Sequence, residues 1–387
     1  MFSVTARWRH RRIADATRHA AANPQAALSS KASDSRPLRS RGAGLNPPNR
    51  FDSVHQDPDS EIDVSPDDDP FPPDLTTYLK DHSETIITYN DSPDVGFDAG
   101  INVYRGCEHG CVYCYARPTH EFLGFSSGLD FERKILIKEK APLLLRHELS
   151  QKKWRPQVLA MSGVTDPYQP IERKKQLTRQ CLKVLADFRN PVGIITKNQL
   201  ITRDIDLLQE LNQFSAVAVF ISLTTLNSNL RRRMEPRTAP PEARLRTIEA
   251  LAKNGIPVGT LLAPIIPGLT DHEIPSLIAR ARDAGAGFAG HVILRLPYQV
   301  KDLFENWLQE HFPDERDKVI NRLKSIRSGA LNSGEFGKRM RGEGIFADQI
   351  HQLFKVSCRK AGILHHHPKL SAAHFRTNPS QLDLFIR

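Results

Sequence analysis

The feature of this sequence that most constrains its fold is a regular alternation of short β-rich runs with helical patterns, which begins near residue 95. β-Branched residues are common in the runs, and the stretches between them carry apolar residues at helical spacing. Strands and helices that alternate in this way build βα units on a parallel sheet. The six runs are Ile101–Tyr104, Val158–Met161, Val192–Thr196, Ala216–Leu223, Val258–Ala263 and His291–Leu296, and the helical stretches lie near 140–150, 173–187, 203–213, 241–254, 271–284 and 301–311.

This alternation predicts an α/β fold and, from its spacing, a partial (β/α)6 barrel over residues 95–311. The alternative is a Rossmann-like open sheet, which is weakened because no Gly-rich fingerprint follows the first run. Residues 76–94 form a lead-in segment, residues 312–362 add a helical C-terminal extension, and residues 363–387 form a flexible tail.

The N-terminal residues 1–75 predict a disordered tail, first basic and then acidic, because they show no sustained apolar period. Within this tail the stretch Gly42–Phe51 is unusual in composition, and a docked arm and free chain both remain open for it. The chain has no apolar run near the roughly 20 residues that a membrane span needs. No apolar region of a signal peptide follows the basic N-terminus. We therefore expect a soluble, cytoplasmic protein without a membrane partner, and a monomer.

The charge of the chain favours a polyanionic partner. The formal net charge is +10, and residues 101–387 hold 43 Lys and Arg against 28 Asp and Glu. A basic body of this kind suits nucleic acid. Two Arg-bearing segments, Arg231–Arg237 and Gly337–Gly344, fit phosphate contacts and equally fit a solvated charge run or a flexible loop.

Three cysteines crowd into eight residues directly after the first β run: Cys107, Cys111 and Cys114. A disulfide satisfies only two of them, and clustered thiols in a chain of this kind more often bind metal. Thiolates suit iron–sulfur clusters or zinc. Three thiolates hold three irons of a cubane and leave the fourth iron open to an amine and a carboxylate of a small molecule.

The alternative for this site is zinc with His109 or His120 as the fourth ligand. Structural zinc sites usually carry their ligands in separated pairs, and no second pair is present here. The remaining cysteines, Cys181 and Cys358, fall in helical patterns and are predicted core residues.

The spacing Cys-x3-Cys-x2-Cys, with Tyr113 just before the last cysteine, resembles the signature of the radical S-adenosylmethionine (SAM) superfamily. The resemblance implies a partial (β/α)6 barrel and a 4Fe–4S cluster on these cysteines. It also implies that one electron from the cluster cleaves SAM to a 5′-deoxyadenosyl radical. A reductant such as flavodoxin or ferredoxin supplies that electron.

Within the superfamily the chain is similar to the spore photoproduct lyase-like, "DNA repair photolyase" branch. The resemblance rests on Cys114-Tyr115, on Ser162–Glu172 and on Thr196-Lys197-Asn198. It implies that Lys197 meets the SAM carboxylate, that Ser222 meets the ribose and that Tyr113 lies against the adenine. The implied cofactor-binding residues are Tyr113, Lys197, Ser222 and Thr165, and the implied catalytic residues are Tyr113, Tyr115 and Asp166.

One position departs from that branch. Gly163 stands where the lyases carry a cysteine that donates a hydrogen atom to the product radical. The spore photoproduct reaction would therefore need another donor, such as a tyrosine. Asp166 and Glu172 form either a polar wall of the site or turn and helix-terminus chemistry. Arg295, at the end of the sixth run, meets SAM, a substrate phosphate or a structural acid, and the sequence does not choose among them.

The last residues resemble the peptide that binds bacterial sliding clamps, through Gln381, Leu382, Leu384 and Phe385. A flexible tail can place such apolar anchors in a groove. The alternative is that this stretch packs on its own domain. The adjacent histidines 365–367 are predicted to be a solvated tail rather than a metal site.

The sequence hypothesis is a radical SAM enzyme that acts on nucleic acid, in particular on damaged DNA. Modification of RNA or of a protein side chain is the alternative substrate class. A zinc-stabilised nucleic-acid-binding adaptor on the sliding clamp is the alternative from another class, and it predicts zinc in place of iron.

Overall fold

A computed structural model describes residues 41–51, 75–364 and 367–377 of the chain. Most of the predicted N-terminal tail, namely residues 1–40 and 52–74, lies outside the described residues, as does the clamp-like peptide Gln381–Phe385. Among the described residues, no helix is long and apolar enough to cross a membrane.

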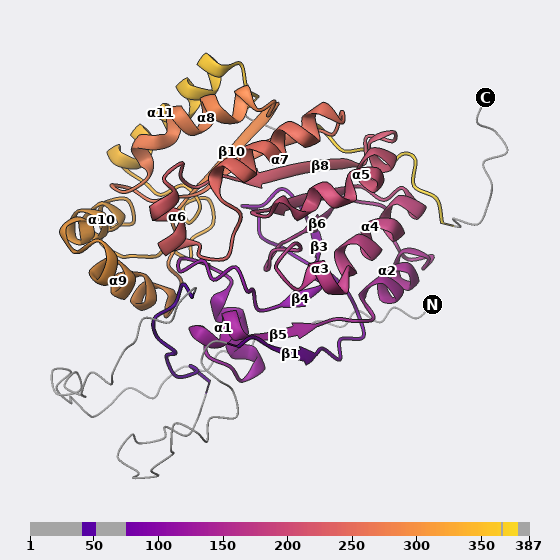
Figure 1. The fold of residues 1–387 in the computed structure, drawn as a ribbon, viewed down its shortest axis with the longest axis horizontal. Coiled ribbons are helices and arrows are strands. Elements are labelled where there is room, and N and C mark those ends of the chain that lie inside the picture. Colours follow the sequence, from indigo (N-terminus) through magenta and orange to yellow (C-terminus); the bar gives the residue numbers. More distant parts are fainter. Residues whose placement is uncertain (1–40, 52–74, 365–366, 378–387) are drawn as a thin grey trace, which may run out of the picture. The chain divides into compact units, whose positions relative to one another are not determined.

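The central element is a seven-stranded sheet in the order β10-β9-β8-β7-β6-β3-β2 (Figure 1). Neighbouring strands from β3 to β10 are parallel and follow one another in sequence order, whereas β2 pairs antiparallel with β3 at the edge. This is the strand order of a partial (β/α)6 barrel, so the predicted fold class is confirmed. The strands are β2 (Ile87–Tyr89), β3 (Ala99–Ile101), β6 (Leu159–Met161), β7 (Val192–Thr196), β8 (Val217–Ser222), β9 (Val258–Ile265) and β10 (Phe288–Ile293).

A row of helices packs against this sheet, and each helix contacts the next (Figure 1). The row runs from α2 through α4 and α5, then by way of the 3-10 turn η3 to α7 and α8. Their apolar faces meet the strands in one large core. The bounds are α2 (Ala141–Leu149), α4 (Leu177–Phe188), η3 (Gln199–Asp204), α5 (Ile205–Asn212), α7 (Pro241–Lys253) and α8 (Ile274–Asp283), with the short α3 (Glu172–Lys175), α6 (Ser228–Met234) and η4 (Asp271–Glu273) between them.

The helical C-terminal extension follows as predicted. Helix α10 packs on α9, and α11 packs on α8, so the extension continues the helical row (Figure 1). The bounds are α9 (Val300–His311), α10 (Pro313–Ser325) and α11 (Ile345–Ala361).

A second, three-stranded sheet in the order β1-β5-β4 was not predicted. The sequence predicts one strand over Ile101–Tyr104, but β3 ends at Ile101 and β4 (Tyr104–Arg105) pairs with β5 (Lys134–Ile137). The Asn102 side chain explains the break, because its Oδ1 accepts hydrogen bonds from the loop after β6, including Val164 N at 3.0 Å. The chain therefore leaves the main sheet and enters the cysteine loop from the small sheet, whose other edge is β1 (Thr77–Lys80).

For Gly42–Phe51 the sequence left a docked arm and free chain open, and the structure shows that residues 41–51 are docked on the body of the protein. We call this segment the arm. The backbone N–H groups of Gly42 and Ala43 donate to the two carboxylate oxygens of buried Glu132, at 3.0 and 2.8 Å. Ala43 is buried with Leu129 of α1 (Leu129–Arg133) and Leu303 of α9. Local composition could not reveal this docking, since Glu132 lies 90 residues beyond Gly42.

Candidate active site

The three cysteines lie on a loop between β4 and the 3-10 helix η2 (Arg117–Leu123), beside the ends of the parallel strands. Two consecutive turns shape this loop: Gly110 N donates to the carbonyl of Cys107 at 3.4 Å, and Cys114 N donates to the carbonyl of Cys111 at 3.2 Å. Gly110 has a φ of +66°, a left-handed conformation that suits glycine. We call residues 106–116 the cysteine loop.

A buried ion pair stabilises this loop. Arg117 and Glu132 are both fully buried and pair with each other at 2.5 Å. Arg117 also donates two hydrogen bonds to the carbonyl of Cys111, at 3.0 and 2.9 Å. The arm completes the support, because a Cβ added to Gly42 would lie 1.6 Å from the carbonyl oxygen of Gly110. Only glycine fits there without movement of the backbone.

The thiols themselves are well placed to become metal ligands. Cys107 and Cys111 are buried, and Cys114 is partly buried. Burial raises the pKa of Cys107 well above its ordinary value, and it raises that of Cys111 to about 12 although Lys197 opposes the change. Without metal the thiols of Cys107 and Cys111 hold their protons, which metal binding displaces. The three cysteine side chains therefore fit an iron–sulfur cluster, whose iron ions would replace the thiol protons.

Among the described residues, no group of three or more His, Cys, Asp and Glu side chains is arranged around a single metal ion. In a cubane cluster each thiolate binds a different iron. The two histidines proposed for zinc have other surroundings. Both ring nitrogens of His109 face partners, Asp166 at 3.3 Å and Asn198 at 3.3 Å. His120 packs between the rings of Phe125 and Phe131, and burial lowers its pKa to about 4.

Tyr113 is held by a buried network that the sequence did not reveal. Its hydroxyl donates to Glu235, which is fully buried and pairs with buried Arg244. Thr224 donates a further hydrogen bond to Glu235 at 2.9 Å. Burial alone would raise the pKa of Glu235, but Arg244, Lys197 and these hydrogen bonds lower it to about 2. The only hint of this network in the sequence is that one acidic residue, Glu235, interrupts the Arg-rich segment 231–237.

Lys197 and Ser222 lie in the same neighbourhood. The ammonium of Lys197 is 5.9 Å from the centroid of the Tyr113 ring, and no hydrogen bond from it is found in the described part of the chain. Ser222 is buried at the end of β8, and its carbonyl accepts from Arg244 at 2.9 Å. The fold thus brings together four predicted site residues, Cys111, Tyr113, Lys197 and Ser222, around Glu235 and Arg244.

Asp166, a predicted catalytic residue, has a supporting position in the structure. Its carboxylate accepts from Thr196 Oγ1 at 2.7 Å, from Lys197 N at 2.8 Å and from Tyr168 N at 2.9 Å. The His109 ring and these donors outweigh burial and lower its pKa to about 2. We therefore assign Asp166 to positioning the cysteine loop and the turn after β7.

The side chains of Thr165 and Glu172 also form hydrogen bonds within the protein. Thr165 Oγ1 donates to the carbonyl of Tyr104 at 3.0 Å, so this hydroxyl ties two loops together. Glu172 is fully buried, accepts from Tyr104 Oη at 2.5 Å and caps the start of α4 through Thr178 N at 3.0 Å. Of the two interpretations of Glu172, helix-terminus chemistry is therefore the one that the structure supports.

Tyr115 lies apart from this group, on the side of β10. Its hydroxyl donates to the carbonyl of Gly163 at 2.8 Å, and the guanidinium of Arg295 lies 5.8 Å from its ring centroid. A Cβ added to Gly163 would meet nothing closer than 3.9 Å, so the position has room for a side chain. Tyr115 therefore lies beside Gly163.

The two Arg-bearing segments are largely structural. In the first, Arg231 donates to the carbonyls of Pro236 and Thr238, both at 3.2 Å, and Arg233 donates to the carbonyl of His311 at 3.1 Å. In the second, Lys338 pairs with Glu335 and Glu343, and Arg339 pairs with Asp94. Most of the basic side chains that the sequence analysis considered for phosphate contacts therefore have partners within the protein.

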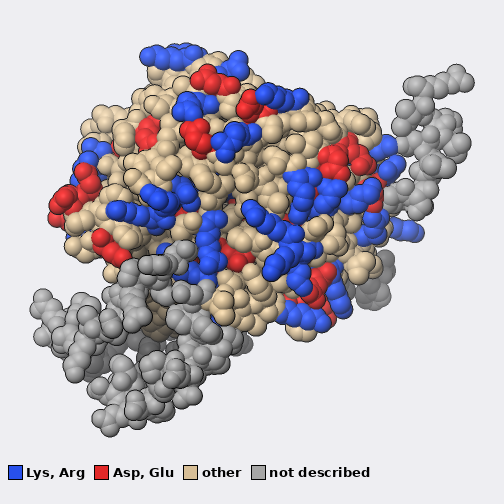
Figure 2. Space-filling model, in the orientation of Figure 1, with Lys and Arg blue, Asp and Glu red and all other residues tan. Residues whose placement is uncertain are grey.

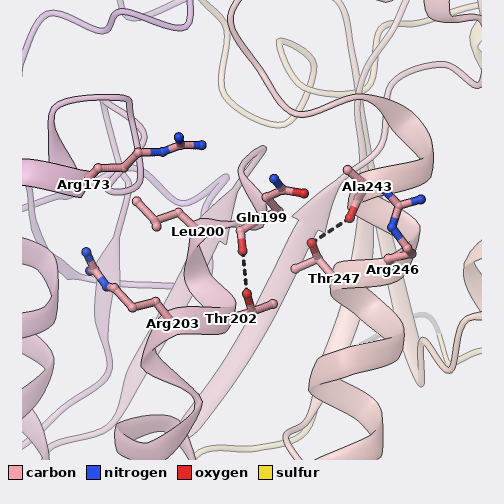
Figure 3. Close-up of a pocket in the computed structure, with 8 residues that line it drawn as sticks. All are labelled: Arg173, Gln199, Leu200, Thr202, Arg203, Ala243, Arg246 and Thr247. Carbon is pink, nitrogen blue, oxygen red and sulfur yellow. Dashed lines mark hydrogen bonds between the residues drawn. The ribbon is translucent and has the colours of Figure 1, made fainter.

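A different group of arginines surrounds a hollow of about 400 Å³ near the end of β7, between α3, η3 and α7. Figure 3 shows Arg173 and Arg203 on one side of it and Arg246 on the other. Lys and Arg side chains also gather on the surface over α3 (Figure 2). We call Arg173, Arg203 and Arg246 the basic rim, and Gln199 and Leu200, which also line the hollow, come shortly after the carboxyl end of β7.

Comparison with known sequences identifies the family. Residues 101–281 match the family model described as the radical SAM superfamily. An uncharacterised protein of Methanocaldococcus jannaschii is 30% identical over 222 residues, which cover 57% of this chain and 79% of that protein. An uncharacterised protein of Mycobacterium tuberculosis is 37% identical over 228 residues, 58% of this chain. This chain spans 66% of the length of that mycobacterial relative.

A protein named radical SAM Nalpha-GlyT isomerase, from a Pseudomonas phage, is 25% identical over 222 residues, which cover 56% of this chain and 43% of that protein. Among solved structures, spore photoproduct lyase complexed with dinucleoside spore photoproduct has a TM-score of 0.52 and 14% identity. The match covers 73% of this chain and 79% of the lyase. This likeness shows a shared fold.

The network around Tyr113 generates a prediction on stability. Glu235→Gln leaves the buried Arg244 without its carboxylate, so the free energy of unfolding should fall by on the order of 3 kcal/mol near neutral pH. The ionised carboxylate stabilises the fold fully above its unfolded pKa of about 4.3. That contribution is lost as the pH falls through the folded value of about 2. Urea denaturation at several pH values measures both effects.

The control is Glu242→Gln, because Glu242 pairs with Arg280 on the surface and should contribute less than about 1 kcal/mol. A penalty for Glu235→Gln that stays constant from neutral pH to acid would contradict the assignment.

Proposed function

Since the chain belongs to the radical SAM superfamily, we propose that Cys107, Cys111 and Cys114 hold a 4Fe–4S cluster that cleaves SAM, and that the substrate is nucleic acid, in particular damaged DNA. The observation that carries the proposal is the grouping of buried Cys111 with Tyr113, Lys197 and Ser222. The superfamily implies both cofactors. When bound, they supply a carbon-centred radical that abstracts a hydrogen atom.

In this proposal the residues around the cysteine loop orient SAM. The ammonium of Lys197 meets its carboxylate, a charge-assisted contact for which the lysine has no competing hydrogen bond in the described residues. The Ser222 hydroxyl meets the ribose. The Tyr113 ring lies against the adenine, and Glu235 fixes the orientation of that ring.

Tyr115 is the proposed residue on the substrate side. It follows the last cysteine and donates to the carbonyl of Gly163, the position that carries a cysteine in the lyases. We assign to its hydroxyl the hydrogen transfer for which this chain lacks that cysteine. A flavodoxin or ferredoxin is the proposed reductant.

Three observations support nucleic acid as the substrate class. The net charge is +10, and arginines surround the hollow between α3, η3 and α7. The fold resembles a lyase that was solved with a dinucleoside lesion. The alternative, a modification of RNA or of a protein side chain, is an outcome of the tests below.

Replacing any of Cys107, Cys111 and Cys114 with alanine should remove most of the iron and reduce SAM cleavage to background, because each thiolate holds one iron. The measurement is anaerobic purification, then iron, sulfide and zinc analysis and an assay of 5′-deoxyadenosine after reduction. Cys181→Ala is the control, since Cys181 is buried in α4 and should leave about four irons per chain. One zinc per wild-type chain without SAM cleavage would favour the adaptor hypothesis.

The basic rim predicts how nucleic acid binds. Replacing Arg173 and Arg246 together with alanine should reduce the slope of log affinity against log salt by about 1 to 2, because each removes a phosphate contact. Titrations with lesion-containing DNA, intact DNA and RNA measure this, and Arg280→Ala is the control because Arg280 pairs with Glu242. A preference for RNA would select the alternative substrate, and no binding of either would reject nucleic acid.

We also propose that the C-terminal residues Gln381, Leu382, Leu384 and Phe385, which lie outside the described residues, bind a bacterial sliding clamp. Deleting Gln381–Phe385 should weaken clamp binding at least tenfold while SAM cleavage stays unchanged. Surface plasmon resonance on immobilised clamp measures the affinity, with Ser380→Ala as the control. Equal affinity of the truncated and full-length chains would remove the clamp from the proposal.

A further inference from the structure

A second hollow, of about 530 Å³, opens beside Tyr115 and differs in character from the basic rim. Its walls come from three separate parts of the chain: the arm, the end of the cysteine loop with the 3-10 helix η2, and the segment after β10. Its lining includes Arg50, Phe51, Tyr115, Phe122, Arg295 and Tyr298. Because Tyr115 follows directly on Cys114, this hollow borders the cysteine loop.

The arm holds its two contributions to this hollow in fixed positions. Asn49 Nδ2 donates to the carbonyl of Glu121 at 2.7 Å, and Arg50 Nε donates to the Glu121 carboxylate at 2.6 Å. Gln299 Nε2 donates to the carbonyl of Pro48 at 2.7 Å. These contacts anchor the arm to η2 and to the segment before α9. Arg50 and Phe51 are therefore preorganised at the hollow.

The rim of the hollow is aromatic and accessible. Phe51 is 55% exposed, Phe122 is 74% exposed and Tyr298 is 60% exposed. The rings of Phe51 and Phe122 lie 4.9 Å apart, and the guanidinium of Arg50 lies 3.8 Å from the centroid of Tyr298. Exposed rings gathered in one place are uncommon on a surface without a partner. Their faces are the kind of surface on which nucleobases stack.

One residue that lines the hollow, Arg295, is a cation without an acidic partner among the described residues. Within the described ranges, no ion pair of Arg295 is found, and its Nε is buried without a hydrogen bond. Its Nη1 reaches only the sulfur of Met340, at 3.4 Å. Arg327 lies close enough to feel its charge, and the nearby Asp94 is already paired with Arg339. A guanidinium in such surroundings favours an anionic ligand.

We propose that this hollow is a subsite for one nucleotide of a nucleic-acid substrate, with the base stacked on Phe51 and Phe122 and the phosphate on Arg295. The inference rests on the proposed function and adds the place where the strand meets the enzyme. It makes the arm part of the active site, because Arg50 and Phe51 line the same hollow as Tyr115. An acidic peptide satisfies Arg295 but leaves the ring faces unused, so a nucleotide is the better match.

The test uses the full chain with its cluster and a fluorescein-labelled single-stranded oligothymidylate. Phe51→Ala and Phe122→Ala should each weaken binding by about 5- to 150-fold, the loss expected for one stacked base. Arg295→Ala should reduce the slope of log affinity against log salt by about 0.7. Fluorescence anisotropy at several salt concentrations separates the two effects, since loss of a stacked ring leaves the slope unchanged.

The matched control is Phe346→Ala, because Phe346 is 44% exposed and has Arg322 over its ring, but lies on α11 away from the hollow. It should bind the oligonucleotide as the wild type does. Wild-type affinity in Phe51→Ala and Arg295→Ala would overturn the subsite, and so would binding of polyglutamate with the same dependence on Phe51. Iron content, measured on every variant, reports separately on the cysteine loop, so failure of the cluster assignment is distinguishable.

Discussion

The buried ion pair between Arg117 and Glu132 is the interaction on which the site depends. It joins the cysteine loop to α1, because Arg117 also binds the carbonyl of Cys111. The same Glu132 carboxylate accepts the two amides of the arm. A buried charge that loses its partner costs several kcal/mol, so neither member can be replaced without loosening the others. One carboxylate therefore sets the positions of the loop, the helix and the arm.

A second buried carboxylate, that of Glu235, has a similar supporting role. Glu235 fixes the Tyr113 hydroxyl and neutralises Arg244, which in turn holds the end of β8 through the carbonyl of Ser222. Asp166 ties the turn after β7 to His109 of the cysteine loop. With these cations and hydrogen bonds already satisfied, Lys197 is the basic group near Cys111 whose ammonium has no hydrogen-bond partner in the described chain.

The proposed division of labour follows from this arrangement. The side of the cysteine loop that faces Lys197 and Ser222 suits a small, charged cofactor. The other side, where Tyr115 lies, borders a hollow with aromatic and cationic walls, which suits a larger substrate. The arginines around the hollow near η3 form a second positive surface. A nucleic acid could therefore contact the protein at two places while a single nucleotide reaches the cysteine loop.

The sequence by itself determined the order of the six parallel strands and of the helices between them, the family and the cysteine loop, because each of these rests on residues that are close together in the chain. The six β runs and the spacing Cys107, Cys111 and Cys114 are local patterns. Only the tertiary structure decided which polar residues support the site. Tyr113 meets Glu235 across 122 residues, and Gly42 meets Glu132 across 90. Such pairs leave no periodic or spaced signal, since they exist only once the chain is folded. For the same reason the sequence left wall and turn or helix-terminus roles open for Asp166 and Glu172, and only the folded structure shows the hydrogen bonds through which they support the site.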